Sequence, residues 1–271
     1  MSEFVTFREN PIHYRTTGSG PWVVLLHGFL ESTEIWDTLA LQLADKFSVL
    51  MIDLPGHGRS GQNAGIHSME YLASSVLAVA DHLMLNEFTV CGHSMGGYVS
   101  LQLAEMRPGL VKGLVLFHSH AAPDDEKARE NRLRTINIVS QDRTGFIHQF
   151  IPELFAEENR HRLAAEIEIL KNRAASTPAR SIVAALQGMK ERSGSLQFLM
   201  ETSIPVFFII GRNDSRMPYS KIVAQAMLPS HAETLLLNRV GHMGFLEAPE
   251  KIFPALISFF FRTLKSTDTF Q

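Results

Sequence analysis

Residues 88–100 read FTVCGHSMGGYVS, an apolar run that leads into a serine enclosed by glycines. The pattern G-x-S-x-G occupies 92–96, it begins where the apolar run ends, and residues with helical spacing follow it. This context predicts a sharp strand-to-helix turn that presents Ser94 as a nucleophile. Gly92 and Gly96 suit such a turn, because a side chain at either position would collide with neighbouring backbone.

A phosphate-binding loop is the competing interpretation of the same glycines. A P-loop requires the lysine of G-x-x-x-x-G-K-[ST], which is missing here, and a dinucleotide fingerprint requires glycine where Ser94 stands. The sequence therefore favours the nucleophile.

The composition indicates one catalytic domain and a small, roughly neutral substrate. The chain has 271 residues, 45% of them hydrophobic, and 25 Lys and Arg against 28 Asp and Glu, so no basic face for nucleic acid is expected. Cys91 is the one cysteine, which excludes an internal disulfide. No uncharged apolar stretch approaches the roughly 18 residues of a membrane helix, and the opening residues lack signal-peptide features. We expect a cytoplasmic protein with no membrane partner.

Alternating strand and helix patterns predict an α/β fold with a mostly parallel sheet. The runs EFVTF and IHYRTTG predict an opening hairpin. Further strands are expected at 22–28, 47–54, 88–93, 111–118, 204–211 and 233–241. Helices are expected at 32–45, 68–84, 96–109 and 248–264.

Residues 119–202 contain no convincing strand and are predicted to form helices separated at Gly145, Pro152, Pro178 and Gly194. So long an interruption between core strands favours a helical cap over the sheet edge, and the alternative is helices that only cover core surface. The expected organisation is a core of 1–118 and 203–271 with a cap of 119–202. The apolar cap residues could line a pocket or an internal core, among them Phe146, Phe150, Leu154, Phe155, Leu186 and Met189.

A nucleophilic serine also needs a base and an orienting acid, and both have candidates at strand ends. His242 follows the last predicted strand, and Asp214 follows the strand before it. If the strands are parallel, both side chains reach the sheet edge that holds Ser94. Asp124 and Asp125, several residues beyond the preceding strand, are the alternative acids, although their position suits a helix N-terminus.

The developing oxyanion needs hydrogen-bond donors, which the turn in LLHGFLES at 25–32 can supply. The backbone N–H groups of Phe29 and Met95 are the expected donors, with their side chains facing the pocket. The alternative is that His27 and Gly28 form a plain loop.

These motifs together resemble the α/β-hydrolase family, in the branch with a helical cap after the sixth strand. The family marks are LLHGF (25–29), DLPGHGRS (53–60), GHSMGG (92–97), GRND (211–214) and GHM (241–243). The resemblance covers nearly the whole chain. It implies an eight-stranded, mostly parallel sheet, the triad Ser94, Asp214 and His242, the Phe29 and Met95 donors, and neither cofactor nor metal. Within the second motif, a structural role in bracing the sheet edge is expected for Asp53, His57 and Arg59.

The expected function is that of a serine hydrolase that cleaves a small carboxylic ester or lactone through an acyl-enzyme. Family members with an aspartate nucleophile, the haloalkane dehalogenases and epoxide hydrolases, are excluded by Ser94. A C–C bond hydrolase or a menaquinone-pathway-like lyase on the same triad is an alternative. Menaquinone relatives commonly carry an arginine where Tyr98 stands, which weighs against them. Cap arginines could still bind a substrate carboxylate, namely Arg129, Arg132 and Arg173.

Two further classes stay open at this stage. The sequence LFHSH places His118 and His120 at a strand end with a spacing that could grip zinc, although further ligands in a sensible order are lacking. The second class is a small-ligand receptor that has the same fold but does not turn over its ligand. Such a receptor would often show a damaged triad. The expected partner is a small acyl molecule, and a homodimer is left open.

Overall fold

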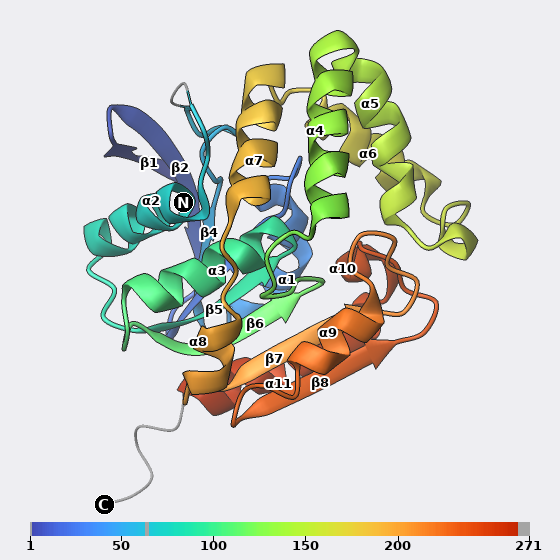
Figure 1. The fold of residues 1–271 in the computed structure, drawn as a ribbon. Coiled ribbons are helices and arrows are strands. Elements are labelled where there is room, and N and C mark those ends of the chain that lie inside the picture. The colour runs from blue at the N-terminus through green and yellow to red at the C-terminus, as the bar shows by residue number, and fades with distance from the viewer. Residues whose placement is uncertain (1, 63–64, 265–271) are drawn as a thin grey trace, which may run out of the picture.

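The computed structural model describes residues 2–62 and 65–264 and shows an eight-stranded sheet between two layers of helices (Figure 1). The strand order is β1-β2-β4-β3-β5-β6-β7-β8. β1 pairs with β2 and β2 with β4 in antiparallel fashion, and every later pairing is parallel. The predicted α/β fold with a mostly parallel sheet is therefore confirmed.

The strands follow the apolar runs of the sequence. Their bounds are β1 Ser2–Phe7, β2 Asn10–Thr17, β3 Trp22–Leu26, β4 Ser48–Ile52, β5 Phe88–His93, β6 Val111–Phe117, β7 Val206–Gly211 and β8 Ala232–Leu237. β4, β5 and β7 are buried along their whole length, because helices cover both faces of the sheet.

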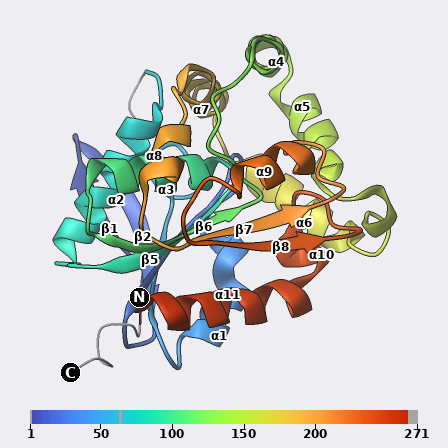
Figure 2. The same ribbon diagram turned by 60° about the horizontal axis from the view of Figure 1, so that its bottom comes forward.

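Helices α1 (Asp37–Leu43) and α11 (Pro249–Leu264) cover one face of the sheet, and α2 (Met69–His82), α3 (Met95–Met106) and α9 (Tyr219–Gln225) cover the other (Figure 2). A 3-10 turn at Thr33–Trp36 precedes α1, and the short α10 (Gly244–Glu247) precedes α11. Within the described residues, no helix combines the length and apolar character needed to cross a bilayer.

Residues 119–202, between β6 and β7, are called the helical insertion here. Throughout this described stretch the regular elements are helical: α4 (Glu126–Gln141), α5 (Arg143–Phe150), α6 (Ala164–Ala174), α7 (Ala179–Glu191), α8 (Leu196–Glu201) and 3-10 turns at Pro152–Leu154 and Glu157–Asn159. α4 to α7 stand beyond one end of the sheet, whereas α8 lies near the other end of the strands (Figure 1). The last residues of the expected core, 265–271, lie outside the described part.

The helix break expected at Gly145 is wrong in position. Gly145 lies inside α5, and the break falls at Asp142, whose side chain accepts a hydrogen bond of 2.8 Å from the Gly145 backbone N–H. Aspartate is a strong N-cap, so it starts a new helix just before a glycine that the helix then tolerates.

Candidate active site

Ser94 lies on the turn between β5 and α3 with backbone angles φ 50° and ψ −114°, a strained conformation for a residue with a side chain. The backbone on both sides fixes it. The Ser94 N–H donates to the Phe117 carbonyl at 2.9 Å, and the Ser119 hydroxyl donates to the Ser94 carbonyl at 2.8 Å. A side chain at Gly92 would strike the Gly96 carbonyl, so the turn is as tight as the sequence predicts.

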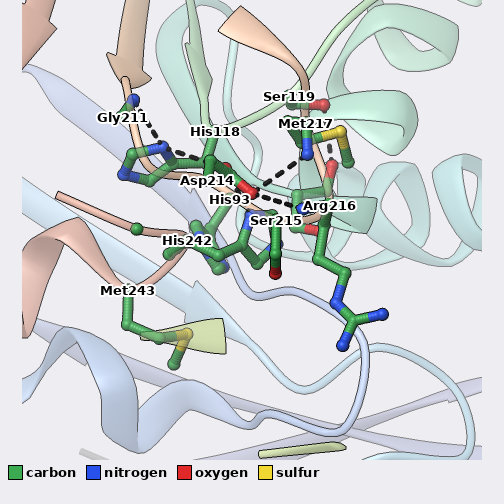
Figure 3. A network of polar contacts seen from close by, with 12 residues as sticks. His93, His118, Ser119, Gly211, Asp214, Ser215, Arg216, Met217, His242 and Met243 are labelled. Atoms are coloured by element: carbon green, nitrogen blue, oxygen red, sulfur yellow. Dashed lines mark hydrogen bonds and ion pairs between the residues drawn. The ribbon is translucent and has the colours of Figure 1, made fainter. Parts of the chain in front are cut away.

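His242 and Asp214 meet at the same end of the sheet. His242 Nδ1 lies 2.7 Å from Asp214 Oδ2, and both side chains are buried. The other carboxylate oxygen accepts backbone N–H bonds from Arg216 at 2.8 Å and Met217 at 3.0 Å (Figure 3). The loop therefore orients the Asp214 carboxylate, and the carboxylate orients the His242 imidazole.

The electrostatics keep Asp214 ionised. Burial alone would raise its pKa, but the attraction and the hydrogen bond of His242, together with the neighbouring His118 ring, outweigh burial and hold the pKa of Asp214 well below its usual range. A carboxylate with these neighbours accepts from His242 Nδ1, which leaves Nε2 as the ring nitrogen able to take a proton.

His118 lies behind Asp214 and was not expected there. Its Nδ1 is 3.4 Å from Asp214 Oδ2 and accepts the Gly211 backbone N–H at 3.2 Å. Among the described residues its Nε2 has no hydrogen-bond partner. Burial lowers the pKa of His118 to about 4, against the opposing effect of Asp214, so the ring is neutral at pH 7.

The alternative acids serve other contacts. Asp124 binds two arginines, Arg192 Nη1 at 2.6 Å and Arg132 through its Nε. Asp125 caps the N-terminus of α4 by accepting the Ala128 N–H at 2.9 Å. Asp214 is the carboxylate that contacts His242.

The turn after β3 lies directly against Ser94. A side chain at Gly28 would come within 3.1 Å of the Ser94 Cβ, and one at Gly96 would strike the Leu26 and His27 carbonyls. In the described residues, the backbone N–H groups of Phe29 and Met95 have no protein acceptor. The expectation for the Met95 side chain is wrong, however, because it is completely buried in the core, whereas Phe29 does line the pocket.

A cavity of about 530 Å³ is lined by Ser94 and His242 together with residues of the helical insertion. Of the apolar candidates, four line it: Phe150, Leu154, Leu186 and Met189. Phe146 and Phe155 belong to the hydrophobic core and do not line the cavity, whereas Leu154, Leu186 and Met189 belong to the core and also line the cavity. The sequence pattern could not tell which of these residues reach the cavity.

The three arginines named from the sequence have different surroundings. Arg132 lines the cavity, while Arg129 is exposed and Arg173 pairs with Glu34 at 2.7 Å elsewhere. Sequence reasoning missed Arg192, whose guanidinium lies 4.0 Å from the centre of the Tyr98 ring. The loop that holds Arg192, just after α7, carried no motif that could have indicated this contact.

His118 and His120 do not act as a pair. His118 lies beside Asp214, whereas the His120 ring contacts Tyr98, with 3.4 Å between His120 Nε2 and the tyrosine hydroxyl. In the described part of the chain, no three His, Cys, Asp or Glu side chains form a group suited to holding a metal ion.

Sequence reasoning also missed Glu31 and His93. Each stands inside a quoted motif, yet neither attracted a role, since neither lies at a triad position. The structure buries both close to Gly28 and Ser94, joins His93 Nδ1 to Glu31 Oε2 at 2.9 Å, and places Glu31 among the residues that line the cavity.

Known proteins share this fold. A family model described as the alpha/beta hydrolase fold matches residues 21–147. A pimeloyl-[acyl-carrier protein] methyl ester esterase of Nitrosomonas europaea is 30% identical over 89% of this chain and 96% of its own length. One from Klebsiella pneumoniae is 30% identical over 89% of this chain and 94% of its own length.

A solved structure gives the same result. A thermophilic esterase from Thermogutta terrifontis, with malate bound, superposes with a TM-score of 0.90 at 29% identity, over 97% of this chain and 98% of that one. The sequence match to the Nitrosomonas europaea relative spans 249 residues rather than the elbow alone. The chain therefore belongs to the α/β-hydrolase fold family.

Proposed function

We propose that this protein is a serine hydrolase that cleaves a small carboxylic ester or lactone through an acyl-enzyme on Ser94. The observation that carries the proposal is the 2.7 Å contact of His242 with Asp214, in a site whose cavity Ser94 and His242 both line. An ionised acid, an oriented imidazole and a serine on a strained turn are the parts that acyl transfer requires.

In the proposed reaction, Ser94 Oγ attacks the carbonyl carbon of the substrate and His242 Nε2 takes the hydroxyl proton. The imidazolium is stabilised by Asp214 and then gives its proton to the departing alcohol oxygen, which leaves the acyl group on Ser94. Water repeats the cycle in the second half and releases the acid. No cofactor enters any of these steps.

The Phe29 and Met95 backbone N–H groups are the proposed donors to the oxyanion. Support comes from their place on the two turns that meet at Ser94 and from their lack of a protein acceptor in the described residues. Donors that point at the developing charge, fixed in advance by the fold, stabilise the transition state more than the ground state.

The helical insertion is proposed to act as a cap that selects the acyl group. It contributes the apolar side chains of Phe150, Leu154, Leu186 and Met189 to a cavity of about 530 Å³. That volume is in the range of sites that bury a small molecule. The named activity of the Nitrosomonas europaea relative, a methyl ester esterase, supports an ester as the substrate.

The test is covalent labelling with a fluorophosphonate, together with turnover of chromogenic esters of rising acyl length and a few lactones. The wild type should be labelled, and Ser94→Ala should lose both labelling and turnover. Ser100→Ala is the matched control, since Ser100 is a buried serine on α3 that donates to the Gly96 carbonyl. Undiminished labelling of Ser94→Ala would refute the assignment.

A further inference from the structure

Glu31 and His93 form a buried pair that the proposed reaction does not use. Their side chains are 3% and 0% exposed. Glu31 Oε2 accepts the Gly28 backbone N–H at 2.5 Å as well as His93 Nδ1 at 2.9 Å. On its other side, His93 Nε2 lies 2.8 Å from the carbonyl oxygen of His242. One chain of contacts thus runs from the turn after β3 to the backbone of His242.

The position of Gly28 shows how closely this chain adjoins the nucleophile. A Cβ added at Gly28 would lie 2.8 Å from Glu31 Oε2, 2.9 Å from His93 Nδ1 and 3.1 Å from Ser94 Cβ. The turn bends back on itself, since the Glu31 N–H donates to the Gly28 carbonyl at 3.3 Å and Leu30 has a φ of 63°. The peptide group that carries the Phe29 N–H is therefore held through the Gly28 carbonyl, which accepts from the Glu31 N–H and, at 2.7 Å, from His27 Nδ1.

The chemistry of the two partners fixes the protonation of His93. A carboxylate and a backbone carbonyl are both acceptors, so each ring nitrogen of His93 must donate, and the ring is an imidazolium. Burial opposes this charge, but the Glu31 carboxylate and the hydrogen bonds of His93 outweigh burial and raise the pKa of His93. In the same way His93 offsets the burial of Glu31 and lowers its pKa.

We propose that the Glu31–His93 ion pair is a positioning device that fixes the oxyanion turn and the His242 backbone in one frame around Ser94. The inference rests on the proposed function, and neither residue touches the reacting atoms. The Glu31 carboxylate fixes the His27–Gly28 peptide, which adjoins the peptide that carries the Phe29 N–H, and His93 ties that peptide to the loop that carries the base. Such a device acts on the transition state, where the oxyanion needs its donors, more than on substrate binding.

The experiment compares Glu31→Ala with Glu31→Gln on one chromogenic ester, with active sites counted by the fluorophosphonate. One oxyanion donor is worth about 10²- to 10³-fold in kcat, and a displaced donor keeps part of that, so Glu31→Ala should lower kcat about 10- to 100-fold with little change in KM. In Glu31→Gln the amide oxygen can take the place of Oε2, the one atom that accepts from both the Gly28 N–H and His93 Nδ1, so both hydrogen bonds can persist without the carboxylate charge. This variant should restore kcat to within about 5-fold of wild type.

His13→Ala is the matched control, because His13 and Asp53 form another buried pair, 2.7 Å apart with both side chains 2% exposed, beside the hairpin. It should lower the melting temperature and leave kcat unchanged. If Glu31→Ala does not fold, the double variant Glu31→Leu with His93→Leu takes its place. It removes both buried charges together, so it leaves no unpaired charge inside the fold. It should show the same loss of kcat.

Three results would overturn the proposal: wild-type kcat in Glu31→Ala or in the double leucine variant, a loss in Glu31→Gln as large as in Glu31→Ala, or an equal loss in His13→Ala. Each of these results counts only if the fluorophosphonate labels Ser94 in the wild-type protein. If the wild type is not labelled at Ser94, the proposed function itself fails, which keeps the two failures distinct.

Discussion

The orientation of the Asp214 carboxylate is fixed by its own loop as well as by His242. Oδ1 is held by two backbone N–H groups of its own loop, which leaves Oδ2 for His242. The buried site makes an unpaired charge costly, so the arrangement persists only while the imidazole donates. The same residue stabilises the imidazolium that forms in the proposed reaction.

Asp214→Asn should lower kcat by up to about 10⁴ with little loss of fold. Asn can keep the bonds from Arg216 and Met217 through its oxygen, and its NH₂ then faces His242 Nδ1. That contact favours a proton on Nε2, the tautomer that cannot accept from Ser94. Initial rates on one ester, with melting curves alongside, measure the effect.

Asp124→Asn is the comparison for this prediction. Asp124 is also a largely buried carboxylate, but it neutralises Arg132 and Arg192. The substitution should cost stability and lower kcat far less than Asp214→Asn. The reverse ranking in folded proteins would move the acid to the loop after β6.

At the scale of elements, Asp53 ties three segments of the sheet edge together. Its carboxylate accepts from His13 on β2 at 2.7 Å, from the Thr33 N–H after β3 at 2.7 Å, and from the Arg59 N–H after β4 at 2.9 Å. The bracing role expected for Asp53 thus has a concrete form. These contacts outweigh the effect of burial and lower the pKa of Asp53 to about 2.

The stability that Asp53 contributes should depend on pH in a defined direction. A carboxyl with a depressed pKa in the fold stabilises it above the unfolded value of 3.8, and that contribution is lost as pH falls toward 2. The shift corresponds to about 2 kcal/mol. Asp53→Asn should therefore be less stable than wild type by about that amount at pH 6, and the gap should close between pH 4 and pH 2.

Urea unfolding at several pH values measures this gap. Asp37→Asn is the control, because Asp37 pairs with Arg15 at the surface with 46% of its side chain exposed. It should change the free energy of unfolding by less than about 1 kcal/mol. A pH-independent gap for Asp53→Asn would show that the carboxylate is not stabilised in the fold as inferred.

At the scale of the whole molecule, the sequence could predict local motifs, but it could not predict contacts between residues that are far apart in the chain. The elbow at Ser94 and the strand ends before Asp214 and His242 carry apolar runs and glycines that indicate their structure. Glu31, His93 and His118 carry no such signal, because the residues that they contact are distant in the sequence. His93 lies 62 residues from Glu31 and 149 residues from His242, and His118 lies 96 residues from Asp214. Contacts of this kind become visible only when the sheet is assembled.

The seating of the helical insertion on the core is another such contact. The His67 N–H donates to the Ala184 carbonyl of α7 at 3.1 Å, so the start of α2 and the insertion share a backbone hydrogen bond. One turn further along α7, Gly188 is buried, and a Cβ there would strike the His67 carbonyl. Leu186 and Met189, on the same helix, line the cavity.

Gly188→Ala should therefore shift α7 away from the core and disturb the cavity wall, although alanine is the better helix former. We expect a lower melting temperature, a cost of about 1–3 kcal/mol from overpacking, and a raised KM for esters whose acyl group contacts α7. Gln187→Ala, one residue earlier on a half-buried side of the helix, should change neither quantity by much. Melting curves and KM across esters of rising acyl length test both variants together. A Gly188→Ala protein as stable as wild type, with an unchanged KM profile, would mean that α7 can move aside without cost and that the insertion does not set the shape of the cavity.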